Sequence, residues 1–371
     1  MMDPISTDDS MIAELRDGAQ RLVADYTDHG RTRRMRRTLP GHDLELAATF
    51  AELGWFGVLV PEADGGIGLG LAEMATLVRE LEKGLIAEPL LAQAVLAARV
   101  LVHAPAGPAR SRLLAGLAAG EIRPALALDF DDALPTVTAT DEGEGFRLSG
   151  TALSVAGAAG ATHLLVPAQL DKGYGLFLLP ADAPGITLSW LWRADDSPLG
   201  QLTLTGVTVP DEVLLAPPMA AEAAISRALD ETRVVAAGAL LGLTEHMLAM
   251  TLEYMGIRRQ YDQLIGSFQA LQHKAVDLYI EKERAVAALG FGLSRAIDPT
   301  TLPLAALRAK GRCSEAASRI AREAIQLHGA IGFTEEHDLG LYVKRALTLS
   351  AWLGNAGEQR RRFVSMGLAL A

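Results

Sequence analysis

The sequence has little of several features that define specific protein classes. One cysteine, Cys313, occurs in 371 residues, which excludes an internal disulfide and is typical of a reducing cytoplasm. Acidic residues outnumber basic ones by 45 to 34, for a net charge of −11. This charge argues against general binding to nucleic acid or to anionic membranes. No His, Cys and carboxylate residues have the spacing of a metal site.

Long hydrophobic runs are also missing from the sequence. The longest apolar helical runs, such as residues 234–243, are shorter than the roughly 20 residues that cross a bilayer. The first ten residues, MMDPISTDDS, are acidic without an apolar core, so we expect no secretory signal. Hydrophobic residues make up 50% of the chain and charged residues 21%, which is typical of globular domains. The composition therefore predicts a soluble, cytoplasmic protein without a membrane span.

Three segments with different residue patterns follow one another along the chain. Residues 1–122 show helical periodicity, clearest at 11–26, 42–53 and 71–84. In residues 123–216, short β-rich segments are separated by Gly, Pro and Asp, which predicts one small antiparallel β-barrel or sandwich. Helical periodicity returns in residues 217–371. The sequence thus predicts an α+β protein with three domains that end near residues 122, 216 and 371.

Two turns in the last of these segments carry the most specific patterns. The first lies between two amphipathic runs, and an ordinary helical hairpin with a charged bend is one interpretation; its pattern is Arg258, Tyr261, Ile265, Gly266, Phe268, Gln269 and Gln272. The second follows a helix, and its pattern is Gln326, Gly329, Gly332, Phe333 and Glu336. We expect Gly329 to cap that helix, because glycine accepts a left-handed backbone. His328 by itself is interpreted as a packed or surface histidine.

Both turns resemble signatures of the acyl-CoA dehydrogenase family. The first is similar to Arg-x-x-Phe-Gly…Ile-x-x-Phe-Gln…Gln, and the second to Gln-x-x-Gly-Gly-x-Gly-Phe/Tyr-x-x-Glu. Residues 53–68 also resemble the LGW-G…PE--GG-G segment of the family's N-terminal helical domain. The resemblance covers essentially the whole chain and is strongest to the small subunits of heteromeric bacterial members.

The resemblance implies an N-terminal helical domain, a middle β-barrel or sandwich and a C-terminal four-helix bundle. It implies FAD as cofactor and an acyl-CoA thioester as substrate. The guanidinium fork of Arg258 suits a pyrophosphate. Asp230 and Arg233 are the implied substrate-binding residues. The implied FAD contacts, made partly across a subunit seam, are Arg258, Tyr261, Phe268, Gln269, Gln326, Gly329, Gly332 and Asn355.

The catalytic base that the family requires has no obvious counterpart here. The family's glutamate comes from one of two places, and Leu353 and Thr232 occupy them in this chain. Three interpretations stay open: a base elsewhere, with Asp230 or Glu231 the nearest carboxylates; pairing with a catalytic homologue; or no dehydrogenation at all. We favour pairing, and we assign no catalytic residue.

The middle segment also departs from the family pattern. The loop at residues 128–132 has lost the Thr-Glu-Pro…Gly-Ser-Asp pattern. Ser154, Val155 and Ala156 stand where an aromatic–Ile–hydroxyl triple covers the flavin in the family. The basic run at residues 30–37 predicts a solvated linker or helix face, with contact to CoA phosphates or to an acidic partner as the alternative.

The leading hypothesis is therefore an FAD-dependent acyl-CoA dehydrogenase subunit that completes a partner's FAD site. The partner is a homologous subunit in a hetero-oligomer, or a second copy of this chain. The alternative from another class is a catalytically silent scaffold or acyl-CoA-binding protein of the same fold. A flavin monooxygenase of this fold is a third possibility.

Overall fold

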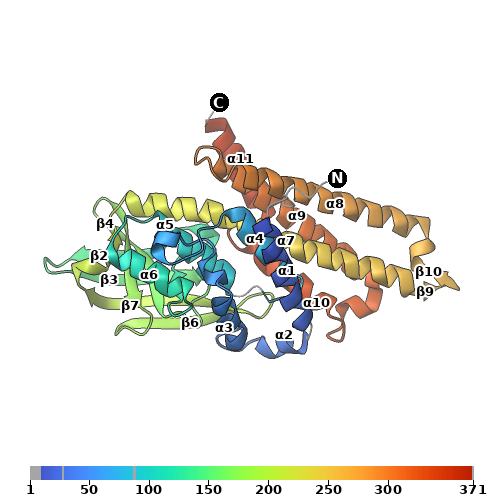
Figure 1. The fold of residues 1–371 in the computed structure, drawn as a ribbon, viewed down its shortest axis with the longest axis horizontal. Coiled ribbons are helices and arrows are strands. Elements are labelled where there is room, and N and C mark those ends of the chain that lie inside the picture. The colour runs from blue at the N-terminus through green and yellow to red at the C-terminus, as the bar shows by residue number, and fades with distance from the viewer. Residues whose placement is uncertain (1–9, 27–28, 87–88, 370–371) are drawn as a thin grey trace. The chain divides into compact units, whose positions relative to one another are not determined.

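The structure is a computed structural model, and it describes residues 10–26, 29–86 and 89–369. Helices precede and follow a central run of strands, as the blue, green and red segments of Figure 1 show. The N-terminal helices are α1 (Ser10–Asp25), α2 (His29–Met35), α3 (Leu44–Glu52), α4 (Leu71–Glu82), a π-helix at Leu91–Ala97, α5 (Ala98–His103) and α6 (Pro108–Ala118). The C-terminal helices are α7 (Ala220–Ile257), α8 (Gln269–Ser294), α9 (Leu302–His328), α10 (Leu339–Ala351) and α11 (Ala356–Ala369).

Eight strands form one predominantly antiparallel sheet between these helices. They are β1 (Pro124–Leu126), β2 (Thr136–Asp141), β3 (Phe146–Val155), β4 (His163–Leu170), β5 (Gly173–Pro180), β6 (Ile186–Trp192), β7 (Pro198–Val209) and β8 (Leu214–Ala216). The strand order is β6-β7-β3-β2-β4-β5-β8, with β1 paired in parallel to β4. The sequence therefore predicted the strand-rich segment correctly but missed the short strand β8.

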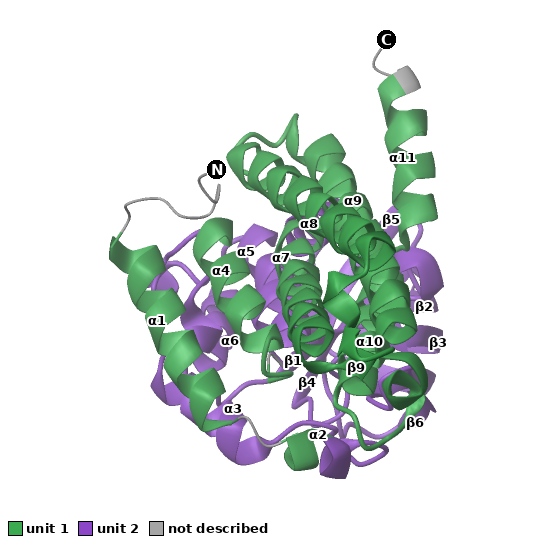
Figure 2. Ribbon diagram, turned by 90° about the vertical axis from the view of Figure 1, so that its right-hand side faces the viewer, with its two compact units in different colours: residues 1–32, 71–87, 233–371 green, residues 33–70, 88–232 purple. Residues whose placement is uncertain are grey.

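The described contacts divide the chain into two compact units, which Figure 2 colours separately. Unit 1 contains residues 1–32, 71–87 and 233–371, and unit 2 contains residues 33–70 and 88–232. Secondary structure changes from helix to strand after Ala118 and back to helix after Ala216. The three-domain division at residues 122 and 216 stays a prediction.

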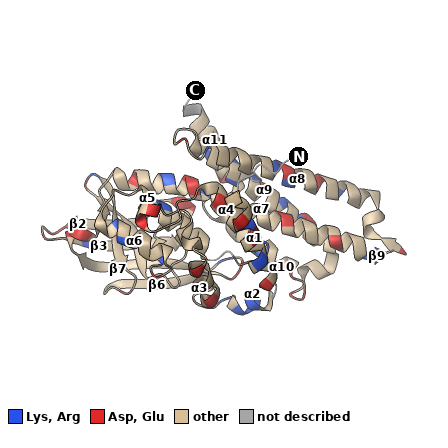
Figure 3. Cartoon of the chain, in the orientation of Figure 1, with Lys and Arg blue, Asp and Glu red and all other residues tan. Residues whose placement is uncertain are grey.

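Unit 2 is built on the sheet and its apolar core. Alternating side chains of β2, β3 and β7 are buried, which gives the period-2 pattern of a half-buried strand. Leu148, Val166 and Phe177 are fully buried in this core. Arg36 and Arg37, from the end of the basic run, donate to the carboxylate of Asp196 over 2.7 and 2.9 Å. Figure 3 shows the basic residues of the preceding helix α2 in blue.

Unit 1 is a helical assembly in which α8, α10 and α11 pack on α9, and α1 packs on α4. Glycines allow close approach at two crossings. A Cβ on Gly242 of α7 would lie 2.0 Å from the carbonyl oxygen of Arg79 in α4. A Cβ on Gly292 of α8 would lie 2.9 Å from the Cβ of Ala309 in α9. Small residues thus set the spacing of the helices that carry the two specific turns.

Helix α7 corrects one expectation about apolar length. It has 38 residues, and within the described residues it is the helix that is long and apolar enough to cross a membrane. However, 78% of its most apolar window is buried inside the protein, which is typical of a core helix. The apolar run at residues 234–243 is therefore only the central part of α7, and the helix is longer than we expected from that run.

Candidate cofactor pocket

The first of the two turns begins at Arg258 and is called the arginine turn below. It folds as a tight β-hairpin, which the sequence did not predict. Helix α7 ends at Ile257, and β9 (Arg259–Gln260) pairs antiparallel with β10 (Gln263–Leu264). The two loop residues, Tyr261 and Asp262, have φ angles of 51° and 62°. Positive φ at both positions is the geometry of a type I′ turn, whose twist matches that of the flanking strands. The hairpin fixes Arg258 at its base, where Ile265 N donates to Arg258 O over 2.9 Å.

The second turn, at Gly329–Phe333, is called the glycine turn below. It ends helix α9, as the sequence predicted. The helix stops at His328, and Gly329 has a φ of 67° with its N–H donating to Ile325 O. A Cβ built on Gly329 would meet no heavy atom within 4 Å. The left-handed conformation is therefore the reason for glycine here, and one side of this backbone faces open space.

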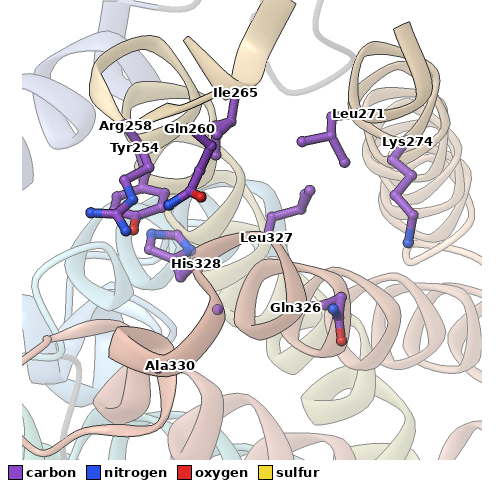
Figure 4. Close-up of a pocket in the computed structure, with 11 residues that line it drawn as sticks. Tyr254, Arg258, Gln260, Ile265, Leu271, Lys274, Gln326, Leu327, His328 and Ala330 are labelled. Carbon is purple, nitrogen blue, oxygen red and sulfur yellow. The ribbon is translucent and has the colours of Figure 1, made fainter. Parts of the chain in front are cut away.

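The two turns line one pocket of about 400 Å³ (Figure 4). Pockets of this volume are typical of small-molecule sites. Three of the residues predicted to contact FAD meet there: Arg258, Gln326 and Gly329. The remaining lining residues are Tyr254, Gln260, Ile265, Leu271, Lys274, Leu327, His328 and Ala330.

The pocket has cationic groups and open hydrogen-bonding capacity. Arg258 is exposed, and its guanidinium makes no hydrogen bond or ion pair within the described part of the chain. Lys274 donates to Oε2 of Glu323 over 2.7 Å. Figure 4 shows Arg258 and Lys274 on opposite sides of the pocket, with Leu271 and Leu327 between them. This donor set fits the phosphate and ribose groups of a nucleotide, because free guanidinium donors match phosphate oxygens.

His328 is packed at the pocket wall, in agreement with the sequence interpretation. Its ring stacks on Tyr254 with centroids 4.5 Å apart, and its Nδ1 donates to Ala324 O over 2.8 Å. Burial lowers the pKa of His328, and the bond to Ala324 O opposes this shift only in part. The imidazole is therefore neutral near pH 7. Within the described ranges, no group of three or more His, Cys, Asp or Glu side chains is placed so that it could hold a metal ion.

The other predicted cofactor contacts lie outside the pocket lining and stay predictions. Tyr261 is 87% exposed at the hairpin tip, and its ring meets the half-buried Phe268 edge-on at 6.3 Å. Gln269 is exposed at the start of α8, and Gly332 is a buried residue of the glycine turn. Asn355 accepts a hydrogen bond from Glu358 N over 3.1 Å, which satisfies a free N–H at the start of α11. This capping bond accounts for Asn355 without a cofactor.

Lys274 and Gln260 are pocket residues that the sequence reasoning missed. Lys274 lies one helical turn after Leu271 on α8, so its spacing places it on the same face. Its acidic partner, Glu323, is 49 residues away on α9. The spacing of Leu271 and Lys274 on one helix face could be read from the sequence. The Lys274–Glu323 ion pair could not, because it depends on how α8 packs on α9.

Glu231, one of the carboxylates nearest to the missing base, is held as an ion-pair partner. It is 2% exposed and contacts Arg99 at 2.5 Å, His103 at 2.9 Å and Arg227 at 3.1 Å. Burial raises the pKa of Glu231, but hydrogen bonds from His103 and Arg99 outweigh burial and lower it to about 2. A carboxylate of such low basicity is poorly suited to accept a proton from carbon.

The two family base positions hold no carboxylate in the structure either. Thr232 is fully buried, and its hydroxyl donates to Ala228 O over 2.6 Å within the helix. Its neighbours Asp230 and Arg233 are both buried on α7, and their role toward a substrate stays a prediction. Leu353 is 3% exposed with a φ of 58°.

The turn around Leu353 is nevertheless firmly supported. The fully buried ammonium of Lys310 donates to Ser350 O over 3.2 Å and to Gly354 O over 3.4 Å. The side-chain amide of Gln359 donates to Leu353 O and to Gly354 O. The backbone of this turn is thus held in place although its side chain is apolar.

The sheet residues that would face a flavin ring do not fit that group. Ser154 N donates to Leu128 O over 2.8 Å, and Asp129 accepts from Leu153 N over 2.8 Å. Val155 and Ala156 are buried. Ser154 stands at the aromatic position of the family triple and Ala156 at its hydroxyl position, and Asp129, Asp131 and Asp132 add negative charge nearby in sequence. The donors of the pocket between the two turns thus fit a nucleotide, whereas residues 154–156 do not fit a flavin ring.

Comparison with known proteins assigns the family. The acyl-CoA dehydrogenase N-terminal domain matches residues 10–121, and the acyl-CoA dehydrogenase C-terminal domain matches residues 222–368. The acyl-CoA dehydrogenase IpdE2 of Mycobacterium tuberculosis is 31% identical over 355 residues, which is 95% of each chain. FadE27 of the same organism is 29% identical over 329 residues, or 86% of this chain and 87% of FadE27.

Solved structures agree with this assignment. The ChsE4–ChsE5 complex from Mycobacterium tuberculosis matches with a TM-score of 0.90 and 27% identity over 100% of both chains. A variant of the Tcur3481–Tcur3483 steroid ACAD matches with a TM-score of 0.87 and 33% identity, covering 96% of this chain and 98% of that one. The chain therefore belongs to the acyl-CoA dehydrogenase family, whose members are FAD-dependent oxidoreductases acting on CH–CH bonds. Its fold is that of the family, and it is of the type found in heteromeric members.

Proposed function

We propose that this chain is one subunit of a cytoplasmic, heteromeric acyl-CoA dehydrogenase and that its pocket holds the nucleotide end of the partner's FAD. The proposal is carried by Arg258, whose guanidinium lies at the pocket with no partner among the described residues, in a chain whose base positions hold Leu353 and Thr232. Two of the similar solved structures are named as pairs of different chains, and this supports a heteromeric partner.

The surface around the pocket supports a partner as well. The hairpin tip and the glycine turn expose large apolar side chains, with Tyr261 87% and Phe333 80% exposed. Ile257 and Ile331 are also exposed beside them in sequence. Clustered exposed apolar residues around a pocket mark interaction sites. A homologous subunit docked there would cover these side chains and close the pocket.

The division of labour follows from the residues present. FAD supplies the hydride acceptor for α,β-dehydrogenation of an acyl-CoA thioester. In this chain, Arg258 would bind the diphosphate, and Gln326 and the Gly329 backbone would fix the adjoining groups. The proton acceptor would come from the homologous subunit. Asp230 and Arg233 remain the proposed substrate-binding residues, and the three-domain division remains part of the proposal.

Co-expression with a homologue that carries the missing glutamate tests this function. We expect the purified pair to be yellow and to bleach near 450 nm when acyl-CoA is added, whereas neither chain alone bleaches. Replacing the glutamate of the homologue by glutamine is the matched control, and it should abolish bleaching while the pair keeps its flavin.

The alternative is a silent scaffold, favoured by the engagement of Glu231 in ion pairs. A colourless homo-oligomer that stays colourless with added FAD, and that fails to pair with the homologue, would support the scaffold and contradict the enzyme subunit. Bleaching by this chain alone would contradict the assigned division of labour.

A further inference from the structure

The pocket has a second polar end at Lys274 of α8, and this lining residue pairs with Glu323 of α9. Nζ of Lys274 lies 2.7 Å from Oε2 of Glu323, and the two side chains are 44% and 34% exposed. The pair therefore joins α8 to α9 at the lining residue Lys274, and both side chains stay accessible to solvent. Gln326 lies one turn after Glu323 on α9, so its side chain belongs to the same face.

This pair has hydrogen-bonding capacity beyond its own bond. An ammonium has three donors and a carboxylate has about four acceptor positions, and the Lys274–Glu323 bond uses one of each. A donor and an acceptor are thus left side by side. Two adjacent hydroxyl groups match this arrangement, because one can donate to the carboxylate while the other accepts from the ammonium. Acidic side chains bind ribose hydroxyls in the same way at other dinucleotide sites.

The position of the pair relative to Arg258 sets the orientation of the ligand. Arg258 and Lys274 lie on opposite sides of the pocket, separated by Leu271 and Leu327 (Figure 4). Among the residues that the structure describes, the guanidinium fork of Arg258 has no partner and can bind phosphate, whereas the charge of Lys274 is already balanced by Glu323. The balanced pair suits neutral hydroxyls better than a second phosphate.

We propose that Lys274 and Glu323 bind the ribose diol of an ADP group whose diphosphate lies at Arg258. This inference rests on the proposed function, since it names two more contacts for the same nucleotide end. Because the pair is partly exposed, its replacement should leave the fold intact.

The test is titration calorimetry of the heteromer, freed of its FAD, with ADP and with 2′,3′-dideoxy-ADP. We expect loss of the diol to weaken binding about tenfold for the wild type and less than twofold for Glu323→Gln or Lys274→Gln. The control is Glu142→Gln, which removes a similar exposed pair with Arg147 in unit 2 and should keep the tenfold difference.

The outcomes that contradict these expectations separate the diol contact from the nucleotide pocket. An equal diol effect in the wild type and in Glu323→Gln overturns the inference. If Arg258→Ala still weakens ADP binding in that case, the proposed function survives. Failure of ADP to bind the wild type overturns both the diol contact and the nucleotide pocket.

Discussion

Glu231 lies near an expected position of the catalytic base, but the structure shows it as a member of a buried ion-pair network. Its carboxylate is buried and satisfied by Arg99, His103 and Arg227. The same partners that make it a poor base make it valuable for stability, because removing one member of a buried ion network leaves the others unpaired. The sequence could place a carboxylate near the base position, but two of its three partners, Arg99 and His103, lie more than 120 residues earlier in the chain.

We predict that Glu231→Gln lowers the free energy of unfolding by about 3 kcal/mol at pH 7. The folded pKa, about 2, lies below the ordinary value of 4.5. The charged form therefore stabilises the fold above pH 4.5, and this contribution is lost as the pH falls toward 2. Urea denaturation of both proteins at pH 7, 4 and 3 measures the difference, which should shrink with acid.

Glu142→Gln is the matched control, because the Glu142–Arg147 pair is exposed and should contribute under about 1 kcal/mol. A Glu231→Gln effect that is the same at pH 3 and pH 7 would show that packing, and not the charge, explains the loss.

At the scale of elements, the pocket depends on helix ends more than on helix faces. The last turns of α7 and α9, and the residues that directly follow α7, supply its polar side chains apart from Lys274. The periodicity of residues 268–279 correctly predicted helix α8, yet Val276 and Tyr279 are more than half exposed. The apolar spacing identified the helix without identifying its buried side. The hairpin was missed because Tyr-Asp is not a usual type I′ pair, for which Asn-Gly is the strongest signal.

The close packing of α7 on α4 depends on a glycine, Gly242, and this dependence can be tested. Gly242→Ala should lower the free energy of unfolding by about 1–3 kcal/mol, because its Cβ would clash with Arg79 O at 2.0 Å. The control is Gly256→Ala in the same helix, where a Cβ meets nothing within 4 Å and alanine should be neutral or slightly stabilising. Urea midpoints of the three proteins decide the matter, and equal midpoints for both variants would refute the close approach.

At the scale of the whole molecule, the sequence predicted the fold class and order of elements well, because long periodic segments and clusters of turn residues are local signals. The π-helix at Leu91–Ala97 and strand β8 were not predicted. The candidate site was predicted in part. Arg258, Gln326 and Gly329 were identified through the family motifs, whereas Lys274 and its pairing with Glu323 depend on packing between α8 and α9.

The chain as a whole has the family fold, with Leu353 and Thr232 at the two expected base positions. Lys310 and Gln359 support the turn at Leu353, so the backbone of this turn is held in place although its side chain is apolar. Under the proposed function, the pocket and the exposed apolar residues of the two turns are what this subunit contributes to a site on another chain.

The most direct measurement of this account is FAD occupancy of the co-purified heteromer, read as the ratio of absorbance at 450 nm to protein concentration. Arg258→Ala should lower the occupancy at limiting FAD tenfold or more, because hydrogen bonds to a charged group contribute about 1.5–3 kcal/mol. Arg147→Ala, an exposed arginine of unit 2, should leave it unchanged. Full occupancy in the Arg258→Ala heteromer would contradict the claim that this pocket holds the nucleotide end of FAD.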